Sequence, residues 1–140
     1  MKRLLLIIPI IALVLLPIGC MDVESMLEDQ ITEALEGLSS TYTIKVGGTA
    51  GLNFSGRYVV ASAAYDPETW VDFSSDSYDV SGNVSQQYIA EDVISVGGMF
   101  QKQAVNGTLE VEIWKGSTKV DSAVTTDPWG AVLVTAIEED

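Results

Sequence analysis

The sequence predicts an all-β protein, an Ig-like antiparallel β-sandwich of about seven strands, preceded by a signal or anchor segment and a short amphipathic helix. Three observations predict this fold class. From Thr41 onward, short runs alternate apolar and polar residues with a period of two. Clusters of Gly, Asn, Asp and Ser separate these runs at intervals of about ten residues. Helical spacing of apolar residues is confined to the stretch before Ser39.

Residues 1–20 are expected to direct the chain out of the cytoplasm. Lys2 and Arg3 precede an uncharged run of 18 residues that extends from Leu4 to Met21. This composition is typical of an export signal, and the run is also close to the length that crosses a bilayer as an uncleaved anchor. In either case the positive residues stay in the cytoplasm. We therefore expect an extracytoplasmic protein anchored to the cell membrane.

The end of this segment, Leu16-Pro17-Ile18-Gly19-Cys20, resembles a prokaryotic lipobox. The resemblance implies that Cys20 becomes the lipidated first residue of a membrane-tethered lipoprotein. Two alternatives stay open, an uncleaved N-terminal helix and a plainly cleaved signal peptide. Cys20 is the only cysteine of the chain, so the exported part has no disulfide bond within itself.

Residues 21–40 are predicted to be a short acidic amphipathic helix or linker. Asp22 can cap the helix, and its other face carries acidic side chains. One apolar stripe at helical spacing predicts the helix; it comprises Val23, Met26, Leu27, Ile31, Ala34, Leu35 and Leu38. The β-sandwich domain is expected over residues 41–137, followed by an acidic tail at 138–140.

The first half of the sandwich domain predicts strands separated by turns and one long loop. Strands are expected at 41–46, 52–54 and 58–64, with Ser55-Gly56 as a turn between the second and the third. Residues 66–79 have little regular spacing and are interpreted as a long loop containing at most one short strand. Strands at 84–91 and 94–104 follow, and Gly97-Gly98 predicts a bulge or a close backbone approach.

The last 30 residues have the clearest alternation. A hairpin joins strands at 109–114 and 118–125. A two-residue loop would place Glu112 opposite Lys119, whereas a four-residue loop would place Trp114 opposite Lys119 in a cation–π contact. The run from Ala131 to Ile137 is nearly all apolar and predicts a strand covered on both sides.

This closing region resembles that of the mycobacterial small membrane proteins (the MmpS family). The resemblance lies in residues 107–136, which contain Gly-Thr-Leu-Glu-Val-Glu-Ile, Gly-Ser-Thr-Lys-Val-Asp-Ser and Trp-Gly-Ala-Val-Leu-Val-Thr-Ala. It implies a single N-terminal membrane segment, an exported β-sandwich and an accessory role beside a large exporter of lipids or siderophores.

Charge and composition exclude several functions. The chain has a formal net charge of −13, and all 20 acidic residues but only five of the seven basic ones follow Cys20. Nucleic acid is therefore excluded as a partner. The chain contains no histidine, which removes Ser-His-Asp and Cys-His catalysis and the usual zinc ligand sets. We expect a protein that is not an enzyme and has no cofactor.

All three asparagines of the chain stand in N-x-[ST] sequons, so Asn53, Asn83 and Asn106 are candidate glycosylation sites. Asn and Ser also favour turns, which is a structural reason for the same pattern. Sequons on an acidic, lipid-tethered chain would suit an archaeal cell surface.

Two further groups of residues are candidate binding sites. Carboxylates of the predicted loop could bind Ca²⁺, although their spacing matches no calcium motif and a solvated acidic loop explains them as well; they are Asp66, Asp72, Asp76 and Asp79. Trp70, Trp114 and Trp129 could form a binding platform for a sugar or a protein, or could serve in core and turn packing.

Two classes of function follow from these expectations. The first is a membrane-tethered binding or accessory protein without catalytic activity, such as an accessory subunit of a membrane transport complex with an integral membrane partner. The alternative is a surface-layer or adhesion module that binds a surface glycan or another surface protein.

Overall fold

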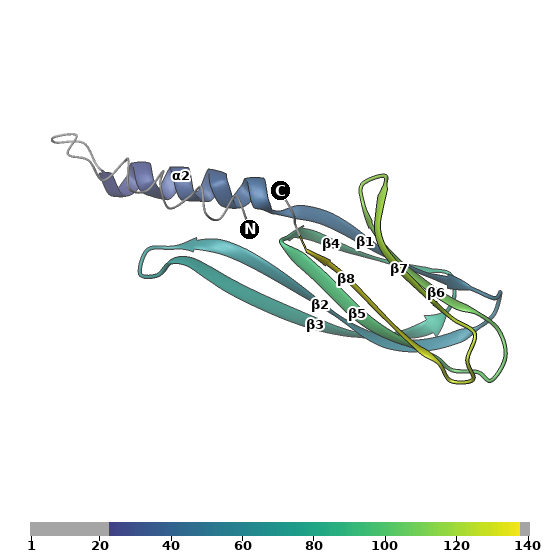
Figure 1. Cartoon of the computed structure of the whole chain (residues 1–140). Coiled ribbons are helices and arrows are strands. Elements are labelled where there is room, and N and C mark those ends of the chain that lie inside the picture. The colour runs from purple at the N-terminus through teal and green to yellow at the C-terminus, as the bar shows by residue number, and fades with distance from the viewer. Residues whose placement is uncertain (1–22, 138–140) are drawn as a thin grey trace.

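One helix is followed in the chain by two four-stranded antiparallel sheets, which pack as a β-sandwich (Figure 1). This architecture confirms the predicted fold class. The computed structural model describes residues 23–137, and for 23–27 it describes the backbone only. Cys20, the rest of the 1–20 segment and the acidic tail at 138–140 lie outside the described residues. Their predicted roles stay predictions.

The sandwich contains eight strands, one more than expected. The elements are α2 (Val23–Leu38), β1 (Ser40–Gly48), β2 (Asn53–Asp66), β3 (Trp70–Asn83), β4 (Gln86–Val93), β5 (Ser95–Lys102), β6 (Leu109–Lys115), β7 (Thr118–Thr125) and β8 (Ala131–Ile137). Sheet A has the strand order β4-β1-β6-β7, and sheet B has the order β3-β2-β5-β8. Connections at one end of the sandwich join β1 to β2, β3 to β4, β5 to β6 and β7 to β8. We call this the loop end, and the opposite end, next to α2, the helix end.

The core lies between the two sheets and consists of alternate residues of their strands. Sheet A contributes side chains such as Ile44 and Val111, and sheet B contributes Phe54 and Val134, all nearly inaccessible to solvent. Full burial of such a side chain contributes about 1.5–3 kcal/mol. The period of two therefore predicts the core correctly, because successive side chains of a strand point to opposite faces.

β2 runs without interruption through Ser55 and Gly56, so the turn predicted there is wrong. Gly56 is required for packing, since a Cβ atom at this position would lie 2.5 Å from a ring carbon of Phe100. A Cβ on Gly98 would lie 2.6 Å from the same ring. Gly97 and Gly98 pair in continuous register with β2, which excludes a bulge there and leaves the close approach. Gly56 and Gly98 thus both adjoin the buried ring of Phe100.

The predicted long loop at 66–79 is also wrong, because most of it is strand β3. β3 pairs with β2 at every position from Asn53 opposite Asn83 to Asp66 opposite Trp70. Most of its side chains are exposed, so the strand shows neither an alternating pattern nor an apolar run. β3 is a strand because it pairs with β2, and the sequence of β3 alone does not reveal this pairing.

β8 is covered on one side only, which corrects the prediction of a strand buried on both sides. It is an edge strand of sheet B, with Val132, Val134 and Ala136 in the core. The alternate residues Leu133 and Ile137 are 67% and 68% exposed. The apolar composition of 131–137 predicted that both faces of the strand are buried. In the described part of the chain, however, no layer covers the outer face of β8.

The β6–β7 hairpin has a two-residue loop, Gly116-Ser117, but its register shifts between Ile113 and Trp114. The loop pairs Trp114 with Lys119, and the shift beyond this pair places Glu112 opposite Ser122. The Trp114–Lys119 pairing of the second alternative is thus found, but the loop that produces it has two residues and not four. The cation over the Trp114 ring is Lys45, whose Nζ lies 4.4 Å from the ring centroid.

Lys102 is completely buried and connects two loops at the loop end. Its ammonium group donates to the carbonyl oxygens of Gly107 at 2.8 Å, Thr126 at 3.0 Å and Val105 at 3.4 Å. Its backbone N–H donates to Gly130 O at 2.8 Å. Hydrogen bonds from an ionised donor are stronger than neutral ones. Lys102 therefore fixes the 103–108 connection against the β7–β8 connection.

We expect Lys102→Met to lower the free energy of unfolding by about 2–4 kcal/mol, because carbonyl oxygens that are buried around the ammonium group lose their donor. Urea unfolding of the full chain in detergent measures the change. The control is Lys119→Met, which removes an exposed lysine from a surface ion pair and should cost less than about 0.5 kcal/mol. Equal stability of the two variants would contradict the role of Lys102.

Candidate functional site

The outer part of the β2–β3 hairpin extends beyond the sandwich at the helix end (Figure 1). The last residue of β2 that pairs with β5 is Ala61, opposite Ser95. Beyond it, residues 62–66 pair only with residues 70–74 of β3. We call this two-stranded ribbon, residues 62–74, the arm. An element that projects from a scaffold and carries exposed aromatic side chains is a candidate contact surface for a partner.

The tip of the arm is an ordered turn. Asp66 Oδ1 accepts the backbone N–H of Glu68 at 2.7 Å and of Thr69 at 2.9 Å, and these two donors lower the pKa of the Asp66 carboxyl group. Trp70 follows with a φ of +73°, and its side chain is exposed, as is that of Phe73. The tip thus presents aromatic rings among acidic residues.

Helix α2 lies alongside the arm and packs against β2 (Figure 1). Ile31 and Leu35 are buried, as the apolar stripe predicts. The helix ends where Ser39 N donates to Leu35 O at 3.1 Å and Ser39 Oγ donates to Glu36 O at 3.1 Å. β1 begins at the next residue, so helix and sandwich are joined without a linker.

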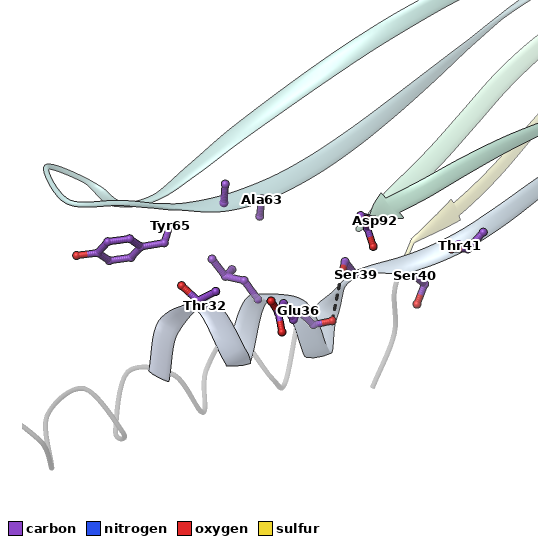
Figure 2. A pocket seen from close by; sticks show the side chains of 10 residues that line it. Thr32, Glu36, Ser39, Ser40, Thr41, Ala63, Tyr65 and Asp92 are labelled. Carbon is purple, nitrogen blue, oxygen red and sulfur yellow. Dashed lines mark hydrogen bonds between the residues drawn. The ribbon is translucent and has the colours of Figure 1, made fainter. Parts of the chain in front are cut away.

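A cleft of about 640 Å³ separates α2 from the arm. Figure 2 shows Thr32 and Glu36 on the helix, Ala63 and Tyr65 on β2, and Asp92 at the end of β4. The other lining residues are Leu35, Ser39, Ser40, Thr41 and Ala64. Hydroxyl groups and two carboxylates line the cleft, and none of these described residues is basic. Such a lining suits a polar or cationic group of a partner.

The structure does not bring the three tryptophans together. Trp70 is at the tip of the arm, and Trp129 lies at the loop end. Trp129 has a φ of +55°, and its backbone N–H donates to Ala104 O while its carbonyl accepts the Gln101 Nε2 group. Trp114 lies on the outer face of sheet A. A common binding platform of the three rings is therefore not formed.

Both the ring face and the N–H group of Trp114 make contacts with other residues of the chain. Its Nε1 donates to Glu112 Oε2 at 2.7 Å, and the ammonium group of Lys45 covers the ring. Lys119 Nζ lies 3.5 Å from Glu112 Oε1. The hydrogen bond from Trp114, and the nearby lysines to a smaller degree, lower the pKa of Glu112. A sugar stacking on this ring would first have to displace Lys45.

The carboxylates proposed as calcium ligands do not converge on one point. Asp66 bonds the turn at the tip, and Asp79 is paired with Arg57, which lowers its pKa. Asp72 and Asp76 are four residues apart on a strand, a separation of about 13 Å. Among the side chains that the structure describes, at 28–137, no group of three or more is arranged to hold a metal ion.

The three sequons gather at the loop end, away from α2. Asn53 and Asn83 are opposite each other on β2 and β3, and Asn106 lies in the neighbouring 103–108 connection. Gln103 N, in that connection, donates to Asn53 O at 2.9 Å. All three asparagines are exposed. Sequence spacing could not reveal that sites 23 or more residues apart share one end of the molecule.

Sequence reasoning missed the arm, the cleft and the buried Lys102. Small residues in β2, Ala61 to Ala64, and the serines of β3 are the only local signal of a ribbon without a core of its own. In the described part of the chain, no helix is long and apolar enough to cross a membrane.

Comparison with protein-family models, with curated proteins and with solved structures gave no match. The similarity to the small membrane proteins of mycobacteria therefore stays a prediction from the sequence.

We expect Glu112→Gln to lower stability at pH 7, because the amide keeps the acceptor for Trp114 but lacks the negative charge beside Lys119 and Lys45. The pKa of Glu112 is lower in the folded chain than its ordinary value of 4.5. The stabilising effect is therefore complete above that value and is lost as the pH falls below it. Urea unfolding of both chains across this range measures the difference, and a difference that grows toward acid would contradict the assignment.

We expect peptides containing Asn53, Asn83 or Asn106 to carry glycan on at least one site in protein purified from its own cells, because all three side chains are accessible at one end. Peptide-level mass spectrometry measures this. The Asn→Gln variant of each occupied site is the control and should lose that mass. Three unmodified peptides would contradict the prediction.

Proposed function

We propose that this protein is a membrane-tethered binding or accessory protein outside the cytoplasm, without catalytic activity, and that it contacts an integral membrane partner through the arm and α2. The observation that carries the proposal is the asymmetry of the sandwich. The arm and α2 lie side by side at the helix end, and α2 directly follows the segment predicted to signal export or to anchor the chain. The residues nearest in sequence to the membrane attachment thus belong to the same end as the exposed aromatic tip.

The dimensions of α2 support this arrangement. A helix of 16 residues is about 24 Å long, and it is joined to β1 at Ser39–Ser40. A chain attached through this helix would keep the arm within a few tens of Å of the membrane surface. An integral membrane protein with a modest extracytoplasmic domain could therefore reach it.

The charge of this end supports a protein partner over a lipid surface. α2 carries Glu28, Asp29, Glu33 and Glu36, and the arm carries Asp66, Glu68 and Asp72. Anionic head groups would be repelled by these carboxylates. Trp and Phe at the tip, surrounded by acidic residues, fit a partner that offers an apolar pocket with a basic rim.

We expect the full chain, purified from its own cells in mild detergent, to retain a multi-span membrane protein in a fixed ratio. Trp70→Ser combined with Phe73→Ser should abolish retention, because it removes the exposed aromatic rings of the arm. Quantitative mass spectrometry of the purified complex measures this.

The matched control is Trp129→Ser, which removes an exposed tryptophan at the loop end and should leave retention unchanged. Retention that survives loss of the two arm rings would overturn the proposal. So would recovery of a surface polysaccharide with no integral membrane protein, an outcome that favours an adhesion module.

A further inference from the structure

The outer face of the four-stranded part of sheet B is almost free of charge, in contrast to the rest of the molecule. It is formed by alternate residues of four strands, which the pairing places in a grid of four rows. They are Ser55, Arg57, Val59 and Ala61 of β2, Ser75, Ser77, Asp79 and Ser81 of β3, Ser95, Gly97, Met99 and Gln101 of β5, and Ala131, Leu133, Thr135 and Ile137 of β8. We call this surface the neutral face.

The only charged residues of the neutral face are Arg57 and Asp79, and they neutralise each other. Arg57 Nε donates to Asp79 Oδ1 at 2.6 Å, and Arg57 Nη2 donates to Asp79 Oδ2 at 3.1 Å. The face therefore has no formal net charge on a chain whose net charge is −13. The outer face of sheet A differs, since it carries Lys45, Glu110 and Glu112.

The neutral face presents exposed apolar side chains among small, uncharged ones. In one row, Arg57 is opposite Met99 and Met99 is opposite Leu133, and these two apolar side chains are 60% and 67% exposed. Serine, alanine and glycine occupy most of the other positions. Beside Arg57 and Asp79 the surface is hollowed by about 720 Å³, with Met99 and Ala131 also at the lining. A side chain of a second molecule can enter this hollow.

The occupant that these features favour is a second copy of this chain. Two molecules with a charge of −13 repel each other wherever acidic surfaces meet, and the neutral face is where two copies approach without that cost. A basic partner would instead be attracted to the carboxylates elsewhere. A two-fold axis near Arg57 and Asp79 would place the guanidinium of each copy beside the carboxylate of the other, which is the self-complementarity of an isologous interface.

The edges of sheet B are less suited than the neutral face to association with a second copy. At the β8 edge, Asp121 Oδ2 accepts the N–H of Thr135 at 2.8 Å, so this backbone donor is already bonded. At the β3 edge, antiparallel pairing with a second copy would bring together strands that each carry Asp72 and Asp76. Face-to-face contact avoids both obstacles.

We propose that two copies of the protein associate face to face through their neutral faces, about a two-fold axis next to the Arg57–Asp79 pair. The face measures roughly 19 Å by 25 Å, or about 475 Å² on each copy, which is the size of a weak, transient interface. The dimer therefore forms with a dissociation constant on the order of tens of micromolar. The arm and α2 lie outside this face, whereas the sequon residues Asn53 and Asn83 border it, one row beyond Ser55 and Ser81. The test therefore uses chains without glycan at these two sites. The proposal does not depend on the function proposed above.

The test is sedimentation of the full chain in detergent, with micelles in excess, at protein concentrations from about 1 to 500 µM. It measures the mass of protein in each particle. We expect a monomer at low concentration and twice that mass at high concentration. Leu133→Asp should weaken the dimer at least about tenfold, since it buries a carboxylate in the interface. The matched control is Val124→Asp on the outer face of sheet A, where Val124 is 56% exposed; it should leave the dimer unchanged.

Arg57→Asp should also prevent association, and the charge swap Arg57→Asp with Asp79→Arg should restore it, because the swapped pair makes the same contacts across the two-fold axis. Thermal unfolding of each variant verifies that it is folded. A wild-type chain that stays monomeric, a dimer that Leu133→Asp leaves intact, or a charge swap that stays monomeric would overturn the proposal.

Discussion

The buried ammonium group of Lys102 is the interaction on which the loop end of the sandwich depends. The inner faces of the two sheets are apolar along most of their length, but the connections that close them bring carbonyl oxygens into the interior. Lys102 satisfies three of them from one atom, and its long aliphatic stem crosses the apolar layer to reach them. One side chain thus provides at this end what a disulfide often provides in exported domains: a fixed distance between two loops that are far apart in sequence.

With the loop end fixed, the two ends of the molecule acquire different characters. The loop end is short, hydrogen-bonded and carries the three sequons, whereas the helix end continues into the arm and α2. The arm has no opposing layer other than α2, so a helix with like charges along its surface gains its stability from the ribbon it covers. The cleft lies between this helix and the two-stranded ribbon.

Charge is distributed as unevenly as shape. Many carboxylates lie on α2 and the arm, and four of the five basic residues that follow Cys20 are used within the sandwich. They are Lys102 in the core, Arg57 with Asp79, and Lys45 and Lys119 around Trp114 and Glu112. This use of cations leaves one face neutral and the helix end strongly acidic. The two surfaces suit different neighbours, a like-charged copy in the first case and a partner with basic groups in the second.

The sequence by itself determined the fold class, the helix at 23–38 and nearly all of the core, because a period of two or of 3.6 states which side chains face inward wherever one face is buried. It also determined the net charge and the absence of histidine, which limit the chemistry available. Prediction from the sequence failed for β3, for the turn at Ser55-Gly56 and for the outer face of β8. These features depend on which strand pairs with the segment and on which layer covers it. Only the tertiary structure decided that the sequons share one end, that the tryptophans and aspartates do not converge, that Lys45 covers Trp114, and that β8 turns Leu133 outward. Pairing between distant strands places these residues, and local periodicity carries no information about which strands become neighbours.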